Sequence, residues 1–139
     1  MKKTITLEAR LENLPKVLAF IDEELERADA PVKIQMQLDI AVEELFVNVA
    51  SYAYPENDGQ VTISMLTHEE TTPHRVEISL TDSGIPFNPL ERKDPDVTLS
   101  AEERGIGGLG IYMVKQSMSN VSYEYKNGQN ILTIFRDLE

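Results

Sequence analysis

Apolar and polar side chains alternate along five short stretches of the chain. In residues 3–9, for example, Ile5, Leu7 and Ala9 share one face, and the residues between them share the other. This period of two is typical of a β-strand with one buried face. We therefore predict strands at residues 3–9, 61–66, 76–82, 121–125 and 131–135.

Three other stretches carry apolar residues at the spacing of an α-helix. The first covers residues 14–28, where Pro15 suits the first helical turn. The second runs from Pro31 to about residue 53, and the third follows a glycine-rich segment and ends near residue 118. The predicted buried positions of the first two helices are Val17, Leu18, Ile21, Leu25, Ile34, Leu38, Ala41, Leu45, Val49 and Tyr52.

The order of these elements predicts the fold class. Residues 67–74 and the Asn127-Gly128 pair each separate two alternating stretches, which is the pattern of a β-hairpin. The whole order predicts an α/β two-layer sandwich, with helices packed on one face of a largely antiparallel (mixed) sheet. A length of 139 residues suits a single domain over residues 1–139.

The composition is that of an acidic globular protein. The chain has 24 Asp and Glu residues against 13 Lys and Arg residues, a formal net charge of −11. This balance argues against direct nucleic-acid binding, which depends on clustered Lys and Arg. The absence of cysteine excludes disulfides and thiol chemistry, and His68 and His74 lack the spacing of metal ligands. Without a signal-peptide core or a long apolar run, we expect no membrane association and a cytoplasmic location.

Four of the seven glycines lie within residues 105–110, immediately before the third predicted helix. Glycine permits close approach to the backbone, and a helix start offers unpaired N–H groups to an anion. The stretch is therefore a candidate phosphate cradle, although a flexible loop has the same composition. Residues 85–104 are rich in proline and charge, and they predict a mobile loop or lid.

Two further patterns carry candidate chemistry. Glu44 and Asn48 lie four residues apart in a predicted helix and so share one face. An Asn oxygen can bind Mg²⁺ and a neighbouring Glu can accept a proton, but a polar helix flank shows the same spacing. Asp82 and Gly84 end a predicted strand, where Asp82 either accepts a hydrogen bond from the amine of a base or belongs to a simple turn.

Taken in order, the three motifs resemble a known family. Residues 43–48 (EELFVN), 82–87 (DSGIPF) and 107–114 (GGLGIYMV) look like the N, G1 and G2 boxes of the GHKL ATPase superfamily. Within it, the sequence is most similar to the anti-sigma factor serine/threonine kinases of bacterial partner-switching systems. The resemblance covers nearly the whole chain and implies a Bergerat-type ATP-binding fold.

The resemblance also implies a role for each motif residue. Asn48 would bind Mg²⁺, Glu44 would be the general base, and Asp82 would hold the adenine amino group. Gly84 would give the base room to enter, and Thr133 would support its recognition. The residues that would contact the phosphates of ATP are Gly107, Gly108, Leu109, Gly110 and Arg104. Arg104 lies further from the glycines than the lid arginine of family members.

An ATP-dependent serine/threonine protein kinase is the function that the resemblance implies. Its substrate would be a small anti-anti-sigma-type antagonist protein, it would also hold a sigma factor, and it would form a homodimer. An alternative is an ATP-gated protein-binding module without physiological phosphotransfer, in which the nucleotide stabilises the loop 85–104 against a partner. A structural domain without any ligand is the third alternative.

Overall fold

The computed structural model describes residues 2–91 and 108–139, with the backbone alone at residues 108 and 109. These residues form a five-stranded sheet in the order β1-β2-β3-β5-β4, and each neighbouring pair is antiparallel. The α/β two-layer sandwich is thus confirmed, but the described sheet is wholly antiparallel rather than mixed. The strands are β1 (Lys2–Glu8), β2 (Gln60–His68), β3 (Arg75–Asp82), β4 (Asn120–Lys126) and β5 (Gln129–Asp137).

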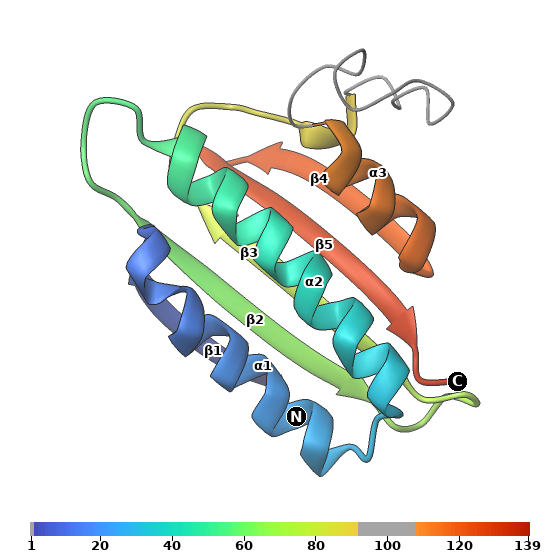
Figure 1. The fold of residues 1–139 in the computed structure, drawn as a ribbon. Helices are drawn as coiled ribbons and strands as arrows, with labels where there is room; N and C mark the ends of the chain where they lie inside the picture. Colours follow the sequence, from blue (N-terminus) through green and yellow to red (C-terminus); the bar gives the residue numbers. More distant parts are fainter. Residues whose placement is uncertain (1, 92–107) are drawn as a thin grey trace.

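The α-helices of the described residues lie together on one face of this sheet (Figure 1). Helix α1 (Leu14–Arg27) lies on the β1 side, α2 (Val32–Asn48) runs along the middle, and α3 (Gly108–Ser117) lies on the β4 side. Short 3-10 turns, η1 (Leu11–Asn13) and η3 (Pro89–Glu91), lie outside the main helices.

Helical spacing predicted the buried faces of α1 and α2 well but failed at the end of α2. The chain continues there as a π-helical segment, η2 (Val49–Ala53). Tyr52, predicted to be buried, is 52% exposed, whereas Ala53 is 6% exposed. A π-turn holds more residues than an α-turn, so it rotates the following side chains away from the α-helical stripe.

The hydrophobic core lies between the helices and the three central strands. Alternate residues of β2, β3 and β5 point toward the helices and are buried. Burying an aliphatic side chain of this size contributes about 1.5–3 kcal/mol to folding stability. Together, these side chains therefore determine which face of the sheet packs against the helices. The buried apolar residues of these three strands are Val61, Ile63, Met65, Val76, Ile78, Leu80, Leu132 and Ile134.

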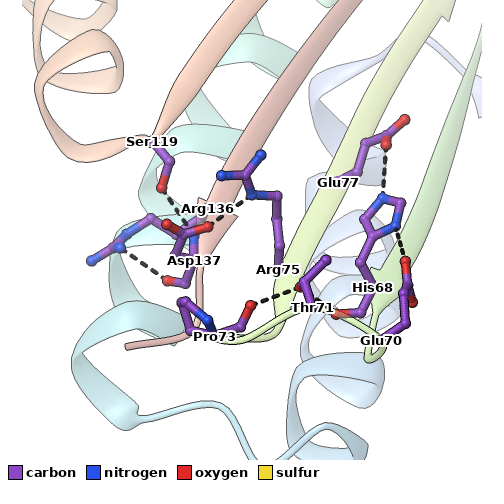
Figure 2. A network of polar contacts seen from close by, with 9 residues as sticks. All are labelled: His68, Glu70, Thr71, Pro73, Arg75, Glu77, Ser119, Arg136 and Asp137. Carbon is purple, nitrogen blue, oxygen red and sulfur yellow. Dashed lines mark hydrogen bonds and ion pairs between the residues drawn. The ribbon is translucent and has the colours of Figure 1, made fainter.

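A polar network closes the end of the sheet where β2 turns into β3 (Figure 2). The two ring nitrogens of His68 lie 3.0 Å from carboxylate oxygens of Glu70 and Glu77, and these hydrogen bonds, that of Glu77 first, raise the pKa of His68. Arg75 Nε donates to Asp137 Oδ1 at 2.8 Å, which links the start of β3 to the end of β5. This contact supports the register that places the far end of β3 opposite the start of β5.

Candidate functional site

A cavity lies between the end of α2, the end of β3, the start of β5 and the segment that follows β3. Most of its walls are apolar, and a few polar side chains from different elements reach it. Apolar walls with a small number of placed polar groups are typical of small-molecule sites. The lining residues are Leu45, Asn48, Val49, Ala53, Leu80, Asp82, Ile85, Phe87, Pro89, Tyr123, Asn130 and Leu132.

Asp82 is the buried carboxylate of this cavity, with 5% of its surface exposed. Its Oδ1 accepts hydrogen bonds from the backbone N–H of Gly84 at 2.9 Å and from Asn130 Nδ2 at 3.0 Å. Among the described residues, its Oδ2 accepts no hydrogen bond. The hydrogen bond from Gly84 shows that Asp82 does form the turn that was one of its two predicted roles. Its Oδ2 can still accept a hydrogen bond from a ligand, which is the other predicted role.

Gly84 allows two backbone segments to come close together. A Cβ atom at this position would lie 2.2 Å from the carbonyl oxygen of Ala53. The next residue, Ile85, donates its N–H to the same oxygen at 2.9 Å. Close packing against η2 therefore requires glycine at position 84. This requirement is separate from the room for an adenine base that the resemblance implies.

Tyr54, which follows η2, is hydrogen-bonded to the residue after β3 and to the first residue of β2. Its hydroxyl accepts a hydrogen bond from the Ser83 N–H at 2.8 Å and donates one to the Gln60 carbonyl at 2.6 Å. Burial raises the pKa of Tyr54, so the hydroxyl remains protonated and able to donate. The end of β3 is thus joined to the segment after η2 and to the start of β2.

Glu44 and Asn48 occupy neighbouring turns of α2, as their spacing predicted. Asn48 lines the cavity. The carboxylate of half-buried Glu44 lies against the first turn of α3, because a Cβ atom on Gly110 would be 2.1 Å from Glu44 Cδ and 2.2 and 2.4 Å from its oxygens. A carboxylate beside a helix N-terminus is electrostatically favourable.

Thr133 is not brought into this site. Its side chain lies on the opposite face of the sheet from Asp82, where its hydroxyl is 2.9 Å from the Ser79 hydroxyl. The residue opposite Asp82 is Asn130, which the sequence analysis missed, as it missed Tyr123. The Asn127-Gly128 turn could have indicated Asn130, because it fixes where β5 begins.

The remaining glycine-motif residues are only partly described. Gly107 and Arg104, together with most of the predicted lid, lie outside the described residues. Gly108 and Leu109 form the first positions of α3, so the helix begins within the glycine motif, close to the predicted start. Within residues 2–91 and 108–139, no group of three or more His, Cys, Asp or Glu residues is placed to hold a metal ion, and none of the helices has the length and apolar character needed to cross a bilayer.

Fold and cavity together define an α/β domain with a candidate small-ligand cavity between its helical layer and its sheet. A family model described as a histidine kinase-like ATPase domain matches residues 7–136. The chain therefore belongs to this family, the GHKL ATPases, which confirms the resemblance seen in the motifs.

Within this family, the chain is similar to proteins named serine-protein kinase RsbW. The chain is 32% identical over 100 residues to the serine-protein kinase RsbW of Listeria monocytogenes serovar 1/2a, covering 68% of this chain and 61% of that protein. It is 30% identical over 99 residues to the RsbW of Bacillus cereus strain ATCC 10987, covering 68% of this chain and 59% of the relative. The chain thus spans about three fifths of the length of these relatives.

The fold also matches a solved structure. The crystal structure of the RsbU and RsbW domains of a Mycobacterium tuberculosis protein aligns with a TM-score of 0.70 at 17% identity. The alignment covers 99% of this chain and 32% of that chain. At this level of identity, the match supports the fold and does not extend to the activity.

Proposed function

We propose that the protein is an ATP-dependent serine/threonine kinase of the anti-sigma type, and that the cavity beside Asp82 takes the adenine base. One observation carries the proposal: the buried carboxylate of Asp82 and the amide of Asn48 line one apolar cavity, and Glu44, one helical turn before Asn48, meets the start of α3. Membership of an ATPase family supports ATP as the nucleotide.

On this proposal the base enters between the apolar walls of the cavity. Oδ2 of Asp82 accepts a hydrogen bond from the exocyclic amine, because its Oδ1 is already occupied by Gly84 and Asn130. Gly107, Gly108, Leu109 and Gly110 bring backbone donors to the phosphates, and Arg104 contacts them from the preceding segment. The start of a helix suits such anions, since its N–H groups are unpaired and its dipole end is positive.

Asn48 fits a role in holding Mg²⁺. It supplies a hard amide oxygen at the cavity, and Mg²⁺ commonly takes only one or two protein ligands and shares its remaining positions with water and phosphate oxygens. When bound, the ion neutralises phosphate charge that develops during transfer.

Glu44 acts as the general base. The hydroxyl oxygen of the substrate forms a bond to the γ-phosphorus while the bond from this phosphorus to its bridging oxygen breaks. ADP leaves with the electron pair of that bond, and Glu44 takes the hydroxyl proton. Because Gly110 has no side chain, the carboxylate can occupy its place beside the start of α3.

The substrate is proposed to be a small anti-anti-sigma-type antagonist protein, with a sigma factor as a second partner and a homodimer as the active form. The relatives named serine-protein kinase support the transfer to a hydroxyl of a protein. The partners themselves come from the family resemblance.

Incubation with γ-labelled ATP, Mg²⁺ and the candidate antagonist tests the proposal. We expect transfer of label to a serine or threonine of the antagonist, and Glu44→Gln should abolish transfer while ATP still binds. Transfer by this variant at the wild-type rate would contradict the role of Glu44. ATP-dependent antagonist capture without transfer, unchanged in Glu44→Gln, would instead favour the ATP-gated binding module.

A further inference from the structure

Asn130, at the start of β5, is the centre of a buried hydrogen-bond network beside the cavity. It is 6% exposed. Its Nδ2 donates to Asp82 Oδ1 at 3.0 Å and to the Ile85 carbonyl at 2.8 Å. Its Oδ1 accepts from the Phe87 N–H at 3.1 Å and from the Tyr123 hydroxyl. The two donor hydrogens and both acceptor sites of the amide are therefore used.

The partners also determine which way the amide points. The carboxylate of Asp82 and the carbonyl of Ile85 can only accept, while the N–H of Phe87 can only donate. A flipped amide would place acceptor against acceptor and donor against donor. Burial raises the pKa of Tyr123, so its hydroxyl stays protonated and completes the set as a donor.

We propose that Asn130 is a positioning residue for nucleotide recognition, an inference that rests on the proposed ATP site. It fixes the rotation of the Asp82 carboxylate, so that a single oxygen is presented to the base. It also joins Ile85 and Phe87, which line the same cavity, to the sheet. One side chain therefore sets both the acceptor that reads the base and the segment that encloses it.

Asparagine is suited to this position by its chemistry. The site needs two donors directed to one side and two acceptor positions directed to the other, at the end of a short side chain. Aspartate keeps the acceptors but turns the donor group into a second carboxylate oxygen facing Asp82 Oδ1. Like-charge repulsion would then rotate or displace the Asp82 carboxylate.

The test measures Kd values for MgATP and MgITP by calorimetry with the full chain. ITP has a carbonyl where ATP has the exocyclic amine, so the ratio of the two Kd values reports the placement of Asp82. For Asn130→Asp we expect at least about tenfold weaker ATP binding at neutral pH and a Kd ratio that falls toward one. Loss of fold stability alone would lower the Tm without changing this ratio.

Tyr123→Phe is a second variant, which tests the positioning role of Asn130 even if Asn130→Asp fails to fold. It removes only the hydroxyl that donates to Asn130 Oδ1, and we expect the preference for ATP over ITP to fall by about three- to tenfold. Ser79→Ala is the control, because it removes a hydrogen bond between β3 and β5, the strands that the Asp82–Asn130 bond also joins, but on the opposite face of the sheet. Its Kd ratio should equal that of the wild type.

The outcomes separate this inference from the proposed function. Wild-type protein that binds neither nucleotide would contradict the ATP site itself. Wild-type protein that prefers ATP, together with unchanged preference in the folded variants of Asn130 and Tyr123, would overturn the positioning role alone.

Discussion

Glu44 and Gly110 come from different helices, and each constrains the other. The Glu44 carboxylate occupies the space that a side chain at position 110 would need. Since this carboxylate is the end of a flexible side chain, an added Cβ would displace it without large strain elsewhere. Glycine at position 110 thus matters for the placement of Glu44, the proposed general base, as well as for the approach of phosphates to the backbone.

Gly110→Ala should therefore reduce phosphotransfer by at least about tenfold while ATP affinity stays near the wild-type value, because alanine keeps the backbone N–H. Stability should stay the same or rise slightly, since alanine favours a helix by about 1 kcal/mol over glycine. Single-turnover transfer of labelled phosphate gives the rate, and thermal unfolding gives the stability.

A double-variant cycle provides the control for this prediction. In a Glu44→Asp background, which keeps a shorter carboxylate and measurable transfer, Gly110→Ala should cause little additional loss, because both changes act on the position of the same carboxylate. Fully additive losses would show instead that Gly110 acts through the phosphates and independently of Glu44.

Asp22 of α1 and Asp39 of α2 bring two carboxyl groups close together, away from the proposed chemistry. Burial, followed by the hydrogen bond and charge of Asp22, raises the pKa of Asp39 from 3.8 to about 7. The folded state therefore holds a proton that the unfolded chain loses near pH 4. The free energy of unfolding should fall as the pH rises from about 4 to 7.

Asp39→Asn should remove this dependence. At pH 8 we expect the variant to be more stable than the wild type by about 1–2 kcal/mol, allowing for solvent screening of a partly exposed pair. At pH 3 the two proteins should be equally stable. Urea unfolding at both pH values measures the difference, and Glu26→Gln, on the exposed side of α1, should leave the pH dependence unchanged.

At the scale of elements, the π-helical segment η2 determines how the cavity is closed. It ends α2 beside Asn48 and presents the Ala53 carbonyl to Gly84 and Ile85. The segment after β3 is therefore positioned by a backbone contact with a helix end, where no side chain can adjust. π-Turns are frequent at functional sites, and here the turn shapes one wall.

Gly84→Ala is the corresponding prediction. Its Cβ would meet backbone atoms of Ala53 at 2.2 and 2.6 Å, so we expect a loss of about 1–3 kcal/mol in stability. ATP affinity should fall as well, because the segment lining the cavity must move. Thermal unfolding and calorimetric titration measure the two effects.

Gly128→Ala is the matched control for that substitution. Gly128 has a φ of 77° and no atom within 4 Å of an added Cβ, so alanine there introduces backbone strain of about 1–2 kcal/mol but no collision. Its ATP affinity should stay at the wild-type value. Equal losses of affinity in the two variants would show that general destabilisation, rather than the contact with η2, governs binding.

At the scale of the whole molecule, nucleotide binding should stabilise the folded chain. Saturation with MgATP at about a hundred times Kd adds roughly 2.7 kcal/mol and should raise the Tm by about 10 °C. Asp82→Asn should lose most of this shift, because an amide nitrogen would face the amine of the base. A wild-type Tm that does not respond to MgATP would contradict the ATP site.

Much of the fold was predictable from the sequence because its signals are local. The alternation in residues 76–82 and the spacing of Val17, Ile21 and Leu25 follow from which face of each element is buried. The motif residues Glu44, Asn48 and Asp82 were found for a similar reason, since their order along the chain is itself the family signal.

Contacts between distant segments were not predictable in the same way. Thr133 was assigned to the site and Asn130 was missed, although they are only three positions apart in β5. Because side chains alternate between the two faces of a strand, register alone decides which of them meets Asp82. Tyr52 was predicted to be buried but is exposed, for a related reason. The change from α-helix to π-helix leaves no clear periodic signal in the sequence.

The sequence by itself therefore determined the elements, the fold class and the family, because burial patterns and motif order are properties of the chain. Only the tertiary structure decided that Asn130 holds Asp82, that Gly84 packs against Ala53 and that Gly110 makes room for Glu44. Each of these contacts joins segments far apart in the chain at atomic distances. Such distances are set by strand register and helix packing, which depend on the whole core at once.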